Sequence, residues 1–314
     1  MTTKTPAISI VVPVFNLEDY VTVALDSILA QENYSDFEIL VIDDHSTDNT
    51  LAVINGYAQK DARIKVLANQ RKKGVAGARN TGFDHAQGDW IAFLDADDTW
   101  ETNNLSSLSS ALNEYPDADI IISDRYEIVN QGDKELLSET DPVWHKYFNA
   151  ANKTGGLLRL DNPIRIFFEE GVLMRTGTCL IRKALVGRVG YCDEELKAAV
   201  DMSWFFKLAA HVDYMVYVPR PLMTYLHRSG SLTRTIPFGF YGVIAYKKML
   251  RSPEFKLYKN HIRQQVALWS LDKTYFYRKN NNKLKAIHAA FEAVLFDFTK
   301  PEHWKNLLAS LLLR

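Results

Sequence analysis

The sequence predicts an α/β fold with a doubly wound, mostly parallel sheet, helices on both of its faces, and a helical C-terminal extension. Three observations lead to this prediction. The first half of the chain alternates short apolar runs with segments of helical spacing. The apolar runs are almost continuous, which is typical of strands buried on both faces. Acidic or polar residues follow three of these runs. Alternation of this kind indicates parallel strands joined by helices.

The composition limits the class of protein. The chain has 314 residues, of which 47% are hydrophobic and 24% charged, so it is neither disordered, collagen-like nor a coiled coil. The net charge is −1, which gives no reason to expect a nucleic-acid partner. Two cysteines, Cys179 and Cys192, are too few for a four-thiolate zinc site. The start lacks the apolar core of a secretory signal, and no apolar run reaches 18 residues. We therefore expect a cytoplasmic protein.

The first half of the chain contains the clearer secondary-structure signals. The β-branched, apolar runs predict strands at 8–14, 37–42, 64–67, 90–94 and 120–123. The helical spacing predicts helices at 20–31, from Ser46 or Thr47 to 57, at 76–86 and at 103–114.

The second half is less regular. Residues 126–160 are polar and contain three glycines, so we expect a loop or a mobile connection. Further patterns predict helices at 164–170 and 198–211, a strand at 214–218, and helices from 238 onward.

The chemistry is expected where the strands end. The first strand runs into Pro13 and Phe15, the second into Asp43-Asp44, and the fourth into Asp95-Ala96-Asp97-Asp98. In a parallel sheet these ends share one edge, so several carboxylates crowd one crevice. Their mutual repulsion favours a bound cation or a ligand rich in donors. An Asp-x-Asp pair suits a hard divalent ion such as Mg²⁺ or Mn²⁺.

Helix capping is the alternative role for some of these carboxylates. Asp98 and Glu101 have the spacing of a capping box, and Asp43 or Asp44 precedes a predicted helix. Capping does not account for Asp95 or Asp97, which lie too far upstream of the helix. We therefore expect Asp97 to bind a metal ion.

Four ordered motifs resemble the family 2 glycosyltransferases: IVVPVFN at 10–16, VIDDHSTD at 41–48, GVAGARNTG at 74–82 and FLDADD at 93–98. The resemblance implies a GT-A fold that binds a nucleotide diphosphate sugar. By this resemblance Pro13, Phe15 and Asp44 line the nucleoside pocket, and Arg79 lies near the nucleotide unless it forms a surface salt bridge. Asp95 and Asp97 match the family's Asp-x-Asp motif, with Asp97 as the ligand of Mn²⁺ or Mg²⁺.

The catalytic base of the family usually belongs to an acidic pair at a helix start, and residues 199–206 match that region. Here the expected Glu is Val200, which leaves Asp201 as the candidate base. The alternative is that Asp201 is only an N-cap, and Asp193, Glu194 and Glu195 compete for the role. The segment from Tyr225 to Thr233 resembles a family loop in which His227 or Arg228 contacts the diphosphate or the metal.

The resemblance implies an inverting, metal-dependent glycosyltransferase of cell-surface polysaccharide synthesis. It favours a UDP-sugar donor and a hydroxyl of a saccharide or lipid-linked saccharide as acceptor. The expected domains are 1–235, with a nucleotide-sugar half (1–125) and an acceptor half (126–235), and a helical region at 236–314. The alternatives are a sugar nucleotidyltransferase, although the acidic stretch 15–19 is unlike a triphosphate loop, and a non-catalytic binding subunit.

The C-terminal region suggests a partner. Residues 244–285 contain eleven Lys and Arg against two Asp and Glu, a net charge of +9. Trp304, Leu307, Leu308 and Leu311 share one face of a predicted helix. This region can lie peripherally on the inner face of the cell membrane. Alternatively it packs on the protein's own core or on a second subunit, as in a homodimer.

Overall fold

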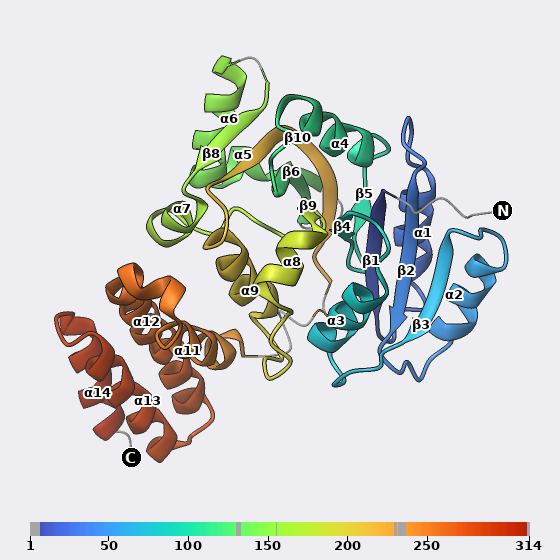
Figure 1. The fold of residues 1–314 in the computed structure, drawn as a ribbon. Helices are drawn as coiled ribbons and strands as arrows, with labels where there is room; N and C mark the ends of the chain where they lie inside the picture. The colour runs from blue at the N-terminus through green and yellow to red at the C-terminus, as the bar shows by residue number, and fades with distance from the viewer. Residues whose placement is uncertain (1–6, 130–132, 155, 229–230, 232–236, 313–314) are drawn as a thin grey trace. The chain divides into compact units, whose positions relative to one another are not determined.

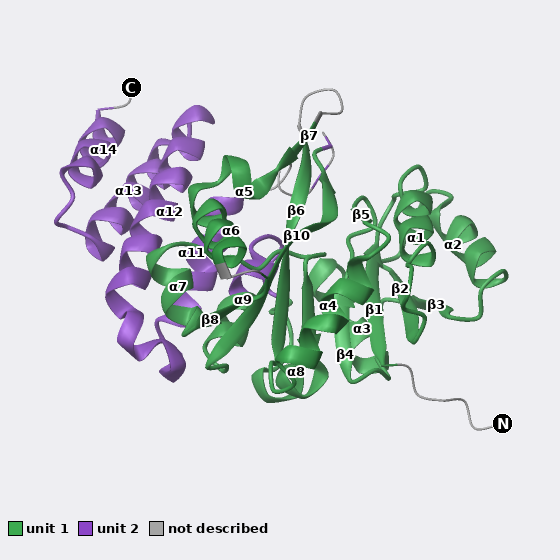
Figure 2. Cartoon of the chain, turned by 90° about the horizontal axis from the view of Figure 1, so that it is seen from above, with its two compact units in different colours: residues 1–194, 204–227 green, residues 195–203, 228–314 purple. Residues whose placement is uncertain are grey.

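The computed structural model describes residues 7–129, 133–154, 156–228, 231 and 237–312. The chain divides into two compact units, shown in different colours in Figure 2. Unit 1 comprises residues 1–194 and 204–227, and unit 2 comprises residues 195–203 and 228–314.

Unit 1 is built on one sheet, which has ten strands within the described residues (Figure 1). The main order is β3-β2-β1-β4-β9-β6-β10-β5, while β7 pairs with β6 and β8 with β10. The strands are β1 (Ile8–Val14), β2 (Phe37–Asp43), β3 (Ile64–Ala68), β4 (Trp90–Phe93), β5 (Thr99–Trp100), β6 (Ile120–Val129), β7 (Asp133–Leu136), β8 (Leu158–Asp161), β9 (Cys179–Arg182) and β10 (Tyr214–Leu226).

The first four strands are parallel to one another, as are β6 and β10. The short strand β9 lies between these two groups and is antiparallel to both β4 and β6. The order of the strands reverses at β1, which has β2 on one side and β4 on the other. Such a switch point, at the carboxyl ends of the strands, is where α/β sheets bind their ligands.

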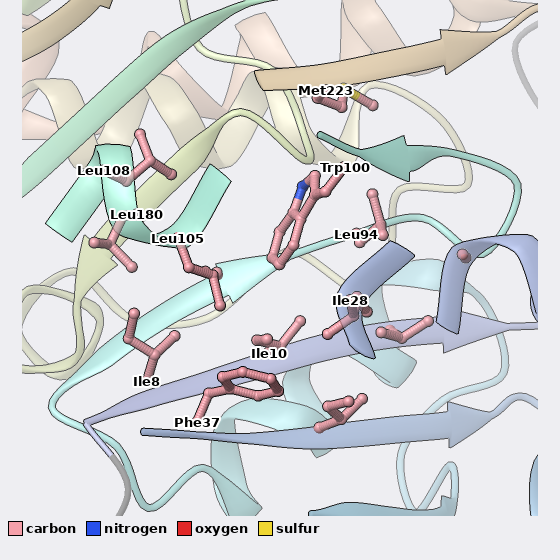
Figure 3. Packing of buried hydrophobic residues seen from close by; sticks show 14 of the residues in the cluster. Ile8, Ile10, Ile28, Phe37, Leu94, Trp100, Leu105, Leu108, Leu180 and Met223 are labelled. Carbon is pink, nitrogen blue, oxygen red and sulfur yellow. The ribbon is translucent and has the colours of Figure 1, made fainter. Parts of the chain in front are cut away.

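Helices cover both faces of the parallel part. On one face, Ile8 and Ile10 of β1 belong to a core cluster with residues of the first and fourth helices, among them Ile28 and Leu105 (Figure 3). On the other face, Gly82 of the third helix lies against Val11. The helices of this part are α1 (Val21–Leu29), α2 (Thr50–Ala58), α3 (Val75–His85) and α4 (Asn104–Glu114).

The expectation of a loop at 126–160 is wrong for most of that segment. Strand β6 continues to Val129, and β7, β8, α5 (Leu137–Thr140) and α6 (Pro142–Thr154) follow. The sequence there is polar, yet Trp144 of α6 is buried, and its ring lies 5.8 Å from that of Tyr217 on β10. Tyr147 and Ala151 of α6 are buried as well, so Trp144 belongs to a buried stripe of helical spacing that attaches this otherwise polar helix to the sheet. The remaining helices of this half are α7 (Pro163–Glu169), α8 (Lys183–Val189) and α9 (Val200–Ala209).

Unit 2 is helical from residue 238 onward, as predicted. Its helices are α11 (Phe238–Met249), the 3₁₀ helix η1 (Pro253–Tyr258), α12 (Lys259–Lys279), α13 (Lys283–Phe296) and α14 (Pro301–Leu311). Gly242 allows α11 to approach α12, because a Cβ at this position would lie 3.1 Å from the Trp269 ring. Among the described residues, no helix is long and apolar enough to cross a bilayer.

Candidate active site

Hydrogen bonds join the loop after β1 to the loop after β2, and we call these two loops the β1–β2 wall of the site. Asn16 and His45 both adopt left-handed backbone conformations, with φ of 51° and 62°. Asn16 Oδ1 accepts the N–H of Thr47 at 2.7 Å, and the Asn16 N–H donates to Ser46 Oγ at 3.0 Å. Left-handed backbone costs a non-glycine residue about 1–3 kcal/mol, which these bonds offset. The predicted start of this helix at Ser46 or Thr47, with that residue as its N-cap, is wrong: α2 begins at Thr50, after Asn49.

Asp44 anchors the start of α3. Its Oδ1 accepts from Asn69 Nδ2 at 2.6 Å, and its Oδ2 accepts the N–H of Gly74 at 2.8 Å. Gly74 directly precedes α3 and has a φ of 131°, a conformation that favours glycine. Asp44 therefore does not cap α2. Asp43 stabilises its own turn instead, since both its oxygens face the Ser46 N–H at 3.2 Å.

Arg79 connects the same helix to the end of β4. Its Nη2 donates to Asp95 Oδ1 at 2.9 Å and reaches Thr176 Oγ1 at 3.4 Å. Arg79 therefore does form a salt bridge, as the alternative to a nucleotide contact expected, but its own side chain is buried and only Asp95 is partly exposed. Arg79 lies five residues beyond Gly74, about 7.5 Å along the helix axis. Helix α3 thus holds Asp44, which follows β2, and Asp95, which follows β4, near its N-terminal half.

Phe15 and Pro13 occupy different positions at the end of β1. Phe15 is exposed, and Lys73 Nζ lies 4.3 Å from the centre of its ring. An exposed aromatic face of this kind can stack on a planar base. Pro13 is buried within the strand, opposite Ile42 in the pairing register. It can shape the pocket only by holding the backbone in place.

Asp98 is buried, with 2% of its surface exposed, and links the β4 turn to β10. Its Oδ1 accepts the N–H of Leu226 at 3.0 Å. Burial and the neighbouring Asp95 and Asp97 charges raise the pKa of Asp98 well above its ordinary value. The capping box is wrong, because the Glu101 carboxylate accepts from Thr224 and pairs with Lys134.

His227 follows Leu226 and lies beside a carboxylate that the sequence reasoning missed. Its Nε2 is 2.9 Å from Glu127 Oε2 on β6, and Glu127 also pairs with Arg125. Burial tends to raise the pKa of Glu127, but Arg125 and His227 outweigh it and lower the pKa. The signal for Glu127 is non-local: β6 and β10 are parallel, with Tyr225 opposite Glu127.

Two acidic residues near α9, Asp201 and Glu194, differ in their position and in their hydrogen bonds. Helix α9 begins at Val200, so Asp201 lies in its first turn and is not the N-cap. Ala199 before it has a φ of 58°. Glu194 accepts from Asn80 Nδ2 at 2.7 Å and also bonds to Arg71. Burial tends to raise the pKa of Glu194, but these bonds lower it, which makes Glu194 a weaker base.

The expected site residues fall in both units. Asp44, Arg79, Asp95, Asp97 and His227 belong to unit 1. Asp201 and the partly buried Arg228 belong to unit 2. Residues 229–230 and 232–233 of the predicted loop lie outside the described residues.

The donor set after β4 suits a cation that binds together with a ligand. Within the described part of the chain, no three His, Cys, Asp or Glu side chains gather as a complete metal cage. Asp97 is half-buried, while Asp95 is paired with Arg79. Mg²⁺ is commonly held by one or two carboxylates together with substrate phosphates and water. The residues present therefore fit a divalent ion shared with a diphosphate.

Comparison with known proteins identifies the family. The family model for glycosyl transferase family 2 matches residues 9–177, more than half of the chain. The chain belongs to this family and is a glycosyltransferase. This membership favours glycosyl transfer over the sugar nucleotidyltransferase and the non-catalytic subunit.

Two relatives illustrate the similarity. Glycosyltransferase GlyG of Streptococcus pneumoniae is 28% identical over 234 residues, which cover 73% of each chain. The UDP-Glc:alpha-D-GlcNAc-diphosphoundecaprenol beta-1,3-glucosyltransferase WfgD of Escherichia coli is 45% identical over 98 residues. That match covers 31% of this chain and 38% of WfgD.

Two solved structures confirm the predicted fold class. TarS of S. aureus (residues 1–349, in complex with UDP-GlcNAc) has a TM-score of 0.66 at 20% identity. The match covers 96% of this chain and 90% of that one. The mannosyltransferase PcManGT of Pyrobaculum calidifontis, in complex with GDP-Man and Mn²⁺, has a TM-score of 0.57 at 18% identity, over 99% of this chain and 86% of that one.

Proposed function

We propose that this glycosyltransferase moves a sugar, with inversion, from a nucleoside diphosphate sugar to a hydroxyl of a saccharide or lipid-linked saccharide. The observation that carries the proposal is the convergence of Asp44 and Asp95 on α3, beside Asp97 and Asp98. The names of two similar proteins support a UDP-sugar donor, and that of WfgD supports a diphosphate-lipid acceptor. Such acceptors are used in cell-surface polysaccharide synthesis.

The nucleoside end of the donor is assigned to the β1–β2 wall. The exposed ring of Phe15 stacks on the base, and Pro13 fixes the strand beneath it. Each Asp44 carboxylate oxygen accepts one hydrogen bond from the protein, and a carboxylate oxygen has a second acceptor site. That site accepts a hydrogen bond from the base or the ribose.

The diphosphate end is assigned to the β4 turn. A bound Mn²⁺ or Mg²⁺ would offset the negative charge that develops as the nucleoside diphosphate leaves. Asp97 would hold the ion, and Arg79 keeps Asp95 in place two residues before Asp97. Arg228, or His227 oriented by Glu127, donates to a phosphate oxygen.

A change at Asp97 tests donor binding. A UDP-sugar with Mn²⁺ should raise the melting temperature, because a ligand at about 1,000 times its dissociation constant adds about 4 kcal/mol to stability. We expect the shift to need both components and to vanish in Asp97→Ala. The control is Asp117→Ala, an exposed carboxylate before the amino end of β6. An undiminished shift in Asp97→Ala would refute the metal assignment.

The role of catalytic general base is assigned to Asp201, which takes the proton of the acceptor hydroxyl. General-base catalysis contributes about 10²–10⁴-fold, so Asp201→Asn should lower kcat by that factor with little change in the donor KM. Matched amide variants of Asp193, Glu194 and Glu195 should retain more activity. NMR of the product should show inverted anomeric configuration, and a retained configuration would contradict the single-base mechanism.

A further inference from the structure

The helices of unit 2 expose large apolar side chains in a regular pattern. On α13, Leu284, Phe291 and Leu295 are exposed at spacings of seven and four residues, which puts them on one helix face. On α14, Trp304, Leu308 and Leu311 are exposed at spacings of four and three residues, which also puts them on one helix face. We call these six residues, together with Phe298 between the helices, the apolar face.

The two helices of the apolar face lie side by side (Figures 1 and 2). Trp304 Nε1 donates to the carbonyl of Phe298 at 2.9 Å, which fixes the connection between them. Phe298 is 69% exposed and Leu308 59%. Exposed apolar groups of this size usually mark a surface that binds a partner or a membrane.

Three basic residues lie near the α13 part of the apolar face. Arg263 Nη2 donates to the carbonyl of Leu295 at 3.1 Å, and Lys283 and Lys285 flank Leu284 in the sequence. Residues 237–312 contain thirteen Lys and Arg and five Asp and Glu, a net charge of +8. Since the whole chain carries −1, the remainder carries −9. The excess of positive charge thus lies in the helical part of unit 2, mostly within residues 237–282, whereas residues 283–312, which carry the apolar face, contain four Lys and Arg against three Asp and Glu.

A pocket adjoins the apolar face between α12 and α13. Its volume is about 350 Å³, and its lining consists of Lys273, Tyr277, Leu284, Lys285, His288 and Ala289. Lys273 pairs with Glu292 at 2.9 Å, while Lys285 lies 5.6 Å from the Tyr277 ring centre. The Lys285 ammonium and the His288 imidazole beside the exposed Leu284 suit a phosphate whose attached chain is apolar, whereas the Lys273 ammonium is already paired with Glu292.

We propose that the apolar face binds the surface of an anionic phospholipid bilayer, with a lipid phosphate in the adjoining pocket. Apolar side chains flanked by lysine and arginine are the pattern of helices that lie in the membrane interface. Each basic residue near an anionic bilayer adds attraction, which salt screens. The charge complementarity selects this occupant over a second copy of the same basic unit. The inference goes beyond sugar transfer and does not depend on it.

The test is sedimentation of the full chain with vesicles of equal parts phosphatidylcholine and phosphatidylglycerol, without donor or metal. At low salt we expect the wild type to sediment with the vesicles, and less with pure phosphatidylcholine or at high salt. Phe298→Ser/Leu308→Ser should weaken binding at least tenfold. The matched control is Val23→Ser/Leu51→Ser, which changes exposed apolar residues of α1 and α2 in unit 1 and should bind like the wild type.

A variant of the pocket and competition by phosphate test the contribution of the pocket separately. Lys285→Gln should lower the bound fraction severalfold, and free inorganic phosphate should compete only weakly, because it lacks the apolar chain. The proposal would be overturned if the wild type stayed in the supernatant. It would also be overturned if Phe298→Ser/Leu308→Ser and the control double variant lost vesicle binding to the same extent. A wild-type dimer that becomes monomeric in Phe298→Ser/Leu308→Ser, without vesicle binding, would assign the face to a second copy. Asp97→Ala should bind vesicles normally, so failure here leaves the proposed transfer reaction intact.

Discussion

At the scale of single residues, Asp98 shows how one carboxylate can serve the structure of a site without touching a ligand. It accepts the Leu226 N–H and so ties the β4 turn to the end of β10, where His227 follows. Asp97 is the adjacent residue of the same turn. The position of the proposed metal ligand and that of the proposed phosphate donor therefore depend on the same buried side chain.

Substitutions of Asp98 should separate the hydrogen bond from the charge. Asp98→Ala leaves the Leu226 N–H without its acceptor, and an unsatisfied buried group costs about 1–3 kcal/mol. Asp98→Asn keeps a carbonyl oxygen at the same place and should lose much less of the free energy of unfolding. Urea denaturation of both variants measures this difference. Equal losses would mean that the bond to Leu226 does not stabilise the turn.

At the scale of secondary-structure elements, α3 determines the geometry of the candidate site. Gly74 at its start bonds Asp44, and Arg79 bonds Asp95. The helix can do both because it packs very closely on β1. A Cβ built at Gly82 would lie 2.4 Å from Val11 Cγ1, inside van der Waals contact.

A pair of glycine substitutions tests this close packing. Gly82→Ala should destabilise the protein by about 1–3 kcal/mol, because the added methyl group overpacks against Val11. Gly56→Ala on α2 is the matched control, since a Cβ there meets nothing within 4 Å. It should stabilise the helix by about 0.5–1 kcal/mol. Urea denaturation measures both, and a neutral Gly82→Ala would show that α3 can move away from β1.

The same scale shows what the sequence could and could not predict. Strands such as 8–14 and 37–42 were predicted because both of their faces are buried, which makes them continuous apolar runs. The polar strands β7 and β8 lack that signal. Strand β9 is apolar but only four residues long, so periodicity cannot identify it.

The residues of the candidate site show the same difference between what the sequence can predict and what depends on strand pairing. Asp44 and Asp95 could be expected at one edge because parallel strands end together. Glu127 could not, because its contact with His227 depends on the pairing of β6 with β10, about a hundred residues apart in the chain. Ser46 and Asp98 likewise form hydrogen bonds with distant segments and do not cap a helix. These bonds depend on tertiary contacts.

At the scale of the whole molecule, both units have buried apolar residues, and unit 2 also contains a buried ionic centre. Unit 1 has the apolar core of the sheet. In unit 2, the buried carboxylate of Glu292 on α13 bonds Lys247 of α11 and both Lys273 and Ser270 of α12. Burial tends to raise the pKa of Glu292, but these bonds outweigh it and lower the pKa from 4.5 to about 2.

The low pKa of Glu292 predicts how unit 2 responds to acid. A carboxyl group whose folded pKa lies below its unfolded value stabilises the fold above the unfolded pKa, and this contribution is lost as the pH falls through the folded one. The contribution should be full above pH 4.5 and disappear towards about pH 2. A shift of this size corresponds to at most about 3 kcal/mol.

Hydrogen exchange of the amides in α11 and α12 measures the effect, because it reports the opening of these helices separately from unit 1. At neutral pH, Glu292→Gln should lower their opening free energy by up to about 3 kcal/mol relative to the wild type. This difference should shrink steadily as the pH falls from 4.5 towards 2, because the wild-type carboxylate then becomes protonated and loses its attraction for the two lysines. Glu254→Gln, an exposed acid of η1 in the same unit, is the control and should change neither quantity. If the two variants showed the same pH dependence, Glu292 could not be the ionic centre that holds α11, α12 and α13 together.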